Sequence, residues 1–372
     1  ATLTVKDPVF WLRLAMQGDL GFAEAYMYGE VDCADLSALF HVLLDNRACL
    51  AEIDTLFAKL SRVVDRFFAS HLVNNLANAR RNISAHYDIS NGMFMAFLSG
   101  DMTYSCAIFP ELDADLRDQS LLGTGSDSTK MLHIVKRADI RPGHRVLEIG
   151  SGWGSMAICM AQAFPGVSVD TLTLSEEQAH LARQRIADIG LGPRPCQRCP
   201  RVRVHLMDYR SMPKEWEGVF DRVVSVEMIE AVGQEFLEKY WAQVDWALKK
   251  DTGVGVVQGI TLPEALFPGG FLPTVSLLVS TMASGSKGRL VVESVDNIGP
   301  HYARTLREWR RRFEDRFEAE VVPALQSQYP EVLGQGVPGY EDQIEVFKRK
   351  WVYYFAYCEA GFASRIRKTP LS

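Results

Sequence analysis

The amino-acid sequence predicts an α/β protein in which a doubly wound parallel sheet follows a helical N-terminal domain. Three observations lead to this prediction. An apolar strand at 145–150 runs directly into three closely spaced glycines, and strand-like runs alternate with helical periodicity after residue 132. Residues 7–78, by contrast, show helical spacing of apolar residues with little strand-like alternation.

The N-terminal part divides into two segments. Residues 1–78 are expected to form a small helical domain. Residues 79–131 concentrate polar side chains among aromatic ones, notably at 86–91 and 103–109, which is unusual for a plain core. We expect this second segment to be a linker or lid whose loops line a site.

The segment 132–372 should hold the main domain. Its alternation of apolar runs predicts that a ligand lies at the carboxyl ends of the strands, as in other doubly wound sheets. The expected strands are 145–150, 168–174, 201–206, 220–227 and 253–261, and the expected helices are 153–164, 175–189 and 235–249.

The alternation stops after residue 260, and the chain there is predicted to form a helical insertion or cap. The insertion is placed at about 262–300, followed by helices at about 302–321 and 342–362. The last helix carries aromatic side chains on all sides. We expect them to wall an apolar cavity, and the alternative is that they fill the core.

Composition narrows the class of protein. The 372 residues carry a net charge of −6, which gives no global attraction for nucleic acid, and no apolar run approaches the roughly 20 residues of a spanning helix. Seven scattered cysteines favour reduced thiols in a cytoplasmic protein. Cys196 and Cys199 form a lone pair that is better explained by a surface loop than by zinc, so no metal is predicted.

The loop after the strand at 145–150 indicates the cofactor. Gly150, Gly152 and Gly154 follow a G-x-G-x-G spacing, which lacks the third glycine position of the dinucleotide fingerprint and the Lys-Ser/Thr of a P-loop. This favours S-adenosylmethionine (SAM) over NAD or ATP. The next two strand ends supply polar and aromatic groups for the same ligand, namely Thr173, Gln178, Asp208 and Tyr209. Ser175 with Gln178 also fits a capping box for the following helix.

Two carboxylates stand three residues apart where the fourth strand ends. A carboxylate at this edge lies where substrate meets cofactor. We assign that role to Glu230 and expect Glu227 to cap the following helix.

These motifs together resemble the cyclopropane-fatty-acyl-phospholipid synthase family of SAM-dependent methyltransferases, in particular its plant and fungal members. The matching segments follow the family's order along nearly the whole chain: 20–29, 86–88 with Asn91 and Phe94, 104–107, 146–154, 173–178, 227–233, 267–270 with 272–273, 301–306 and 351–362. The resemblance implies a Rossmann-like class I methyltransferase domain behind a lipid-facing N-terminal domain.

The resemblance also implies roles for single residues. In this family a methyl group passes from SAM to a cis double bond of an acyl chain, and a bound bicarbonate then removes a proton so that a cyclopropane ring closes. The bicarbonate site would be formed by Cys106, Glu230, Tyr302, Gln258 and Ile260, the last through its backbone. SAM would be held by Tyr104, Ser105, Glu148, Gly150, Gly152, Gly154, Thr173, Gln178, Asp208 and Tyr209.

Two departures from the family pattern keep alternatives open. Gln258 stands where a histidine usually completes the anion site, and Ala231 replaces a histidine after the catalytic glutamate. The product is therefore a cyclopropane or a methyl-branched chain. The alternatives are an N-methyltransferase acting on an alkaloid-like amine and an inactive SAM- or lipid-binding protein. Expected partners are an unsaturated acyl lipid and, peripherally, a membrane surface reached by the N-terminal helices or basic clusters. A homodimer is compatible with these expectations, and nucleic acid is not an expected partner.

Overall fold

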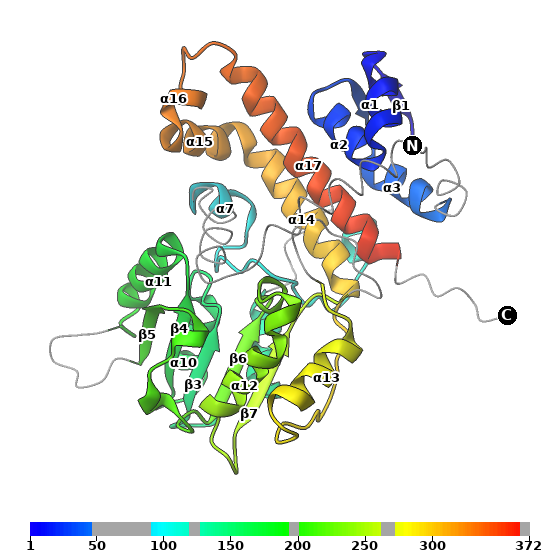
Figure 1. Cartoon of the computed structure of the whole chain (residues 1–372). Coiled ribbons are helices and arrows are strands. Elements are labelled where there is room, and N and C mark those ends of the chain that lie inside the picture. Colours follow the sequence, from blue (N-terminus) through cyan, green and yellow to red (C-terminus); the bar gives the residue numbers. More distant parts are fainter. Residues whose placement is uncertain (47–90, 119–126, 193–200, 262–271, 365–372) are drawn as a thin grey trace.

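A computed structural model describes residues 1–46, 91–118, 127–192, 201–261 and 272–364 (Figure 1). Its centre is a sheet of five parallel strands in the order β5-β4-β3-β6-β7. Their bounds are β3 Arg145–Ile149, β4 Ser168–Thr173, β5 Val202–Leu206, β6 Arg222–Val226 and β7 Val254–Gln258. The predicted strands are therefore confirmed, each a little shorter than expected.

Helices cover both faces of this sheet, which confirms the doubly wound fold class. Val146 packs with α9 (Asp127–Arg137), α10 (Ser155–Ala163) and α11 (Glu176–Asp188), all on one face. Its neighbour Leu147 packs on the other face with α12 (Leu237–Ala247) and α13 (Val275–Gly285). Because successive side chains of a strand point to opposite faces, a nearly continuous apolar strand suits burial on both sides.

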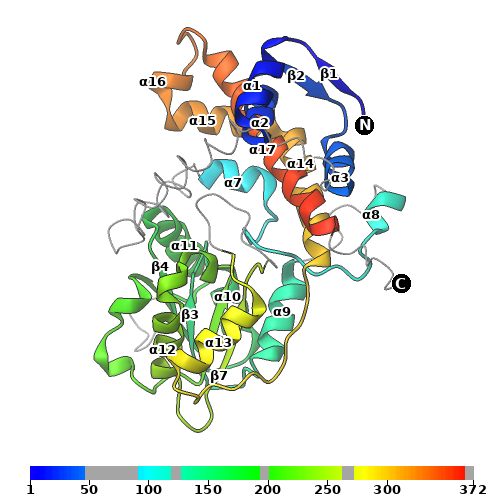
Figure 2. The ribbon, with the colours of Figure 1, turned by 45° about the vertical axis from the view of Figure 1, so that its right-hand side comes forward.

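A helical cap lies above the carboxyl ends of the strands (Figures 1 and 2). Its two long helices, α14 (Pro300–Arg316) and α17 (Tyr340–Ser364), run side by side. Phe355 and Trp351 of α17 are buried against Phe97 and Phe313. The smaller elements of the cap are α7 (Asn91–Phe97), the π-helix η6 (Phe317–Val321), α15 (Val322–Gln328) and α16 (Pro330–Leu333).

This packing corrects one expectation for the last helix. We expected its aromatic side chains to wall an apolar cavity. The innermost of them instead form a dense aromatic cluster, with ring centroids of Trp351, Phe355 and Phe97 between 5.4 and 5.7 Å apart. The alternative, aromatic side chains that fill the core, therefore describes Trp351 and Phe355 correctly.

The N-terminal region is mainly helical, as expected, but it also holds two strands that the prediction missed. Besides the helices α1 (Val9–Gln17), α2 (Asp19–Met27) and α3 (Leu36–Asp45), this region contains an antiparallel pair of strands, β1 (Leu3–Val5) and β2 (Val31–Cys33). Three-residue strands are too short to show an alternating pattern. This region packs on α17, where Arg349 donates to the carbonyls of Tyr26 and Val31 at 2.5 and 2.7 Å (Figure 2).

The helix α8 (Ala114–Arg117) comes between α7 and α9 in the order of elements along the chain. Several sequence predictions lie outside the described residues. They are the helical pattern at 56–68, the boundary at 78, the motif at 86–88, the pair Cys196 and Cys199, and the motif at 267–270.

Candidate active site

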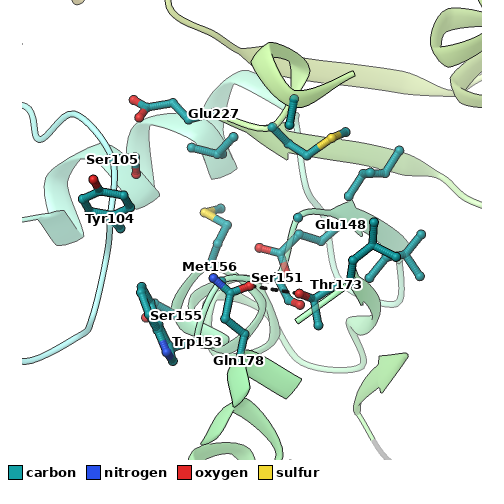
Figure 3. A pocket seen from close by; sticks show the side chains of 18 of the residues that line it. Tyr104, Ser105, Glu148, Ser151, Trp153, Ser155, Met156, Thr173, Gln178 and Glu227 are labelled. Atoms are coloured by element: carbon teal, nitrogen blue, oxygen red, sulfur yellow. Dashed lines mark hydrogen bonds between the residues drawn. The ribbon is translucent and has the colours of Figure 1, made fainter. Parts of the chain in front are cut away.

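A pocket opens at the carboxyl ends of β3, β4, β5 and β6 (Figure 3). Every residue predicted to hold the cofactor lines it except Gly154. Figure 3 shows Glu148, Ser151 and Thr173 together on one side and Tyr104, Ser105 and Glu227 on the other. The prediction that the ligand site lies at this edge of the sheet thus agrees with the position of the pocket.

The glycine loop leaves room for a ligand at one position and packs closely at the others. Gly150 has φ +100° and a side chain on it would come within 3.2 Å of Met228 Cβ. Gly152 has φ +47°, and nothing lies within 4 Å of where its side chain would project. Gly154 instead is the N-cap of α10, and a side chain on it would come within 3.3 Å of Ala182 Cβ. Gly152 therefore borders the open part of the pocket, whereas Gly154 serves the packing of the helix.

Two buried polar atoms in the pocket match the needs of SAM. The Oε2 atom of Glu148 and the hydroxyl of Ser151 have no hydrogen-bond partner within the described structure. Burial raises the pKa of Glu148 to about 8. Because a buried acceptor without a partner is costly, this pair suits a ligand that brings hydroxyl and amine donors, as the ribose and amino acid parts of SAM do. The residues present fit the cofactor.

The next strand ends supply further polar groups. The Thr173 hydroxyl donates to Gln178 Oε1 at 2.9 Å, and Gln178 N–H donates to the Ser175 hydroxyl at 3.1 Å. Of the predicted capping box, the bond from the Gln178 N–H to the Ser175 hydroxyl is formed. The reciprocal bond from the Gln178 side chain is replaced by its contact with Thr173. Asp208 is held by Arg210, with 2.7 Å between Oδ2 and Nη2.

The carboxylate of Glu227 accepts three hydrogen bonds at this end of the sheet. It accepts from the Cys106 backbone N–H at 2.9 Å, from Gln258 Nε2 at 2.8 Å and from the Tyr302 hydroxyl at 2.6 Å. The backbone of Glu227 has φ +48°, a left-handed conformation that is uncommon outside glycine. Our expectation that Glu227 caps the next helix is therefore wrong, because its side chain points to donors from three other parts of the chain.

Glu230 lies against the Ile260 backbone, as the resemblance implied, but the other expected donors do not bind it. It accepts from the Ile260 N–H, and its Oε2 atom is buried without a partner in the described structure. Burial, with the nearby charge of Glu227, raises the pKa of Glu230 to about 7. Glu227 lines the cofactor pocket, whereas Glu230 is not among the lining residues. Three of the donors expected around bicarbonate, from Cys106, Gln258 and Tyr302, thus bind Glu227.

These contacts leave the predicted bicarbonate site without its donor set. A resident bicarbonate would need the same N–H and O–H groups that the Glu227 carboxylate already engages. Two anions in contact would also repel each other. The residues present therefore do not fit a bound bicarbonate ion.

Among the pocket residues that the sequence analysis did not single out are Lys130 and Trp153. Lys130 of α9 is 1 % exposed, lines the pocket and donates to the Ser105 hydroxyl. Trp153, inside the glycine loop, donates from Nε1 to Asn91 Oδ1 at 2.7 Å and joins the loop to α7. A lysine on a polar, amphipathic helix gives no signal of burial, but the tryptophan between two loop glycines could have drawn attention.

Comparisons with known proteins agree with this architecture. Residues 74–331 match the family model described as mycolic acid cyclopropane synthetase. The tuberculostearic acid methyltransferase UfaA1 of Mycobacterium tuberculosis is 35% identical over 95% of this chain and 78% of its own length. The cyclopropane-fatty-acyl-phospholipid synthase of Escherichia coli K12 is 31% identical over 98% and 85%.

Solved structures show the same fold. The mycolic acid cyclopropane synthase CmaA1 complexed with SAH and CTAB has a TM-score of 0.58 at 25% identity, covering 76% of this chain and 94% of that one. Coclaurine N-methyltransferase has a TM-score of 0.66 over 92% and 94%, but at 17% identity this likeness concerns the fold alone. The chain therefore belongs to the mycolic acid cyclopropane synthetase family, and it is a SAM-dependent methyltransferase.

Proposed function

We propose that this enzyme transfers a methyl group from SAM to the cis double bond of an unsaturated acyl chain in a phospholipid. The product is a cyclopropane or a methyl-branched chain. The observation that carries the proposal is the match along nearly the whole chain to two relatives whose names specify fatty acyl products. The buried, aromatic surroundings of the pocket support an apolar acceptor.

The residues around the pocket have separate tasks in this reaction. SAM supplies an electrophilic methyl group. Glu148 and Ser151, whose buried polar atoms lack partners in the described structure, would hold the cofactor at one end of the pocket by accepting and donating hydrogen bonds. An alkene is a weak nucleophile, so most of the rate enhancement must come from alignment, which is worth about 7–11 kcal/mol in favourable cases.

Aromatic rings next to the pocket suit the charge that develops on the acyl chain. Tyr104 lines the pocket and stacks on Trp309 with centroids 5.1 Å apart and an interplanar angle of 25°. The ring of Phe94 contacts those of Tyr104 and Trp153, with centroid distances of 5.3 and 4.9 Å. Methyl transfer leaves a carbocation on the substrate, and aromatic faces stabilise a cation without reacting with it as water would.

An exposed apolar surface on the N-terminal helices supports contact with a membrane. Trp11 and Leu12 are 58% and 61% exposed, and Val9, Met16 and Leu20 are also exposed. No helix in the described part of the chain is long and apolar enough to cross a bilayer. On the strength of these exposed side chains we include in the proposal a peripheral association at the cytoplasmic face of a membrane, in which α1 and the start of α2 lie in the lipid interface.

The proposal is tested with SAM that carries a deuterated methyl group and with vesicles of monounsaturated phospholipid. Mass spectrometry of the released fatty acids should show the added carbon, with two of the three deuterons retained if a ring has closed. Vesicles of saturated phospholipid serve as the control. Absence of label from the unsaturated lipid would overturn the proposal.

A second acceptor class belongs in the same experiment. The carboxylate of Glu227 beside the cofactor pocket is also the kind of base that an amine acceptor needs. A tetrahydroisoquinoline amine should remain unlabelled if the enzyme acts on lipid. Labelled amine together with unlabelled lipid would assign the enzyme to N-methylation.

A further inference from the structure

The Glu227 carboxylate has the surroundings of a bound anion. Its three donors come from the loop before α8, from the end of β7 and from the start of α14, so the site exists only in the folded protein. Both oxygens are engaged, Oε1 by the Cys106 N–H and Gln258 and Oε2 by the Tyr302 hydroxyl. A flat group with two acceptor oxygens is the shape that these donors recognise.

The position of Glu227 also places it beside the reaction. Glu227 lines the cofactor pocket together with Ser105 and Lys130. The positive charge of Lys130 favours the ionised form of Glu227, as do the three donors, while burial raises the pKa of this carboxyl. The result is a buried carboxylate that is more basic than an exposed one and that is held in one orientation.

Glu230 is less suited to the same task. It does not line the pocket, and the Ile260 N–H holds one of its oxygens. Two adjacent buried carboxyls do not both ionise readily, and burial together with the charge of Glu227 raises the pKa of Glu230 to about 7. The carboxylate available to the substrate is therefore Glu227.

We propose that Glu227 is the internal base of this enzyme and takes the proton that a free bicarbonate ion would otherwise remove. This inference rests on the proposed lipid function. After methyl transfer, one C–H bond of the new methyl group breaks and its electron pair forms the bond to the cationic carbon, which closes the ring. The proton passes to a carboxylate oxygen of Glu227 and leaves to solvent after product release.

The first test compares turnover in buffer depleted of bicarbonate with turnover after bicarbonate is added. The wild-type enzyme should change less than about twofold. Glu227→Gln should lower turnover about 100-fold or more, the usual contribution of a general base, while affinity for S-adenosylhomocysteine changes less than about threefold. Glu235→Gln, which removes an exposed carboxylate from the same segment, is the matched control. A bicarbonate requirement in the wild type, or full turnover in Glu227→Gln, would overturn the proposal.

The second test separates this inference from the proposed function. Glycine accepts the left-handed backbone at position 227, so Glu227→Gly should fold and leave the donors of Cys106, Gln258 and Tyr302 open to an added anion. Binding of ¹³C-labelled bicarbonate, followed by NMR, should be seen in Glu227→Gly and not in the wild type. Added bicarbonate should also raise turnover of Glu227→Gly at least about tenfold.

The outcomes of this second test are distinct. Bicarbonate binding by the wild type would show that Glu227 does not fill the anion site. If unsaturated lipid is not methylated by the wild type, the proposed function fails, and the binding comparison still decides whether Glu227 occupies the site.

Discussion

The cofactor edge of the sheet and the helical cap above it depend on different kinds of sequence information. At the cofactor edge, Glu148, Gly150 and Gly152 lie in one short segment, and a single strand and turn set their positions. In the cap, Phe97, Phe313 and Phe355 meet although long stretches of chain separate them. A local pattern therefore locates the cofactor edge, whereas the cap depends on how distant helices pack.

If the cap is a close-packed core, truncating its centre should have the largest effect on stability. Phe355 is fully buried between Phe97, Phe313 and Trp351. We expect Phe355→Ala to lower the free energy of unfolding by about 3–5 kcal/mol, because the cavity cannot fully collapse. Denaturant unfolding measures this change. Phe355→Leu should cost clearly less, and equal losses for both variants would contradict a tightly packed cap.

At the cofactor edge of the sheet, replacing the buried Glu148 should affect ligand binding more than the stability of the fold. Glu148→Gln replaces the carboxylate that faces the pocket with a neutral amide. We expect the affinity for S-adenosylhomocysteine, measured by calorimetry, to fall about 10- to 100-fold, since hydrogen bonds to a charged group contribute about 1.5–3 kcal/mol. Glu177→Gln, at an exposed position of α11, is the control. Unchanged affinity would remove Glu148 from the cofactor site.

The pH dependence of binding sharpens the same point. Burial raises the pKa of Glu148 to about 8, so at neutral pH the ligand-free protein must release a proton before the carboxylate can accept from the ligand. Affinity for S-adenosylhomocysteine should rise with pH up to about 8, by no more than about tenfold per unit, and then level off.

The control for this dependence is Glu148→Gln, in which the rise should be absent. The raised pKa of Glu148 also affects the stability of the ligand-free protein. The free energy of unfolding should fall as the pH rises from 4.5 to about 8, because in this range the unfolded chain has lost the Glu148 proton and the folded protein still holds it. A pH profile that Glu148→Gln shares with the wild type would contradict this assignment.

The smallest effect is expected on the outer surface of the N-terminal helices. Replacing Trp11 and Leu12 with serine should lower binding to phospholipid vesicles several-fold, because two exposed apolar side chains no longer enter the interface. Co-sedimentation measures this binding. Leu116→Ser, which removes an exposed apolar side chain from α8, should leave it unchanged, and an equal loss in that variant would show that α1 is not the contact surface.

The sequence by itself determined the parallel sheet and part of the lining of the cofactor pocket, including Glu148, Gly150 and Thr173. Strand length, glycine spacing and the polar residues after each strand are local features, and parallel strands bring their carboxyl ends to one edge. The sequence could not show the N-terminal strand pair or the burial of Lys130, since three-residue strands and one lysine on an amphipathic helix carry no distinctive pattern.

Only the tertiary structure decided which glutamate takes the donors at the active site. Glu227 and Glu230 stand three residues apart, and the sequence alone placed the donors from Cys106, Gln258 and Tyr302 around Glu230, whereas the structure places them around Glu227. The donors to Glu227 lie 121, 31 and 75 residues away in the chain. Because a side chain is oriented by the partners that folding brings to it, a left-handed turn after β6 and three distant donors fixed the orientation of Glu227, which residue spacing could not reveal.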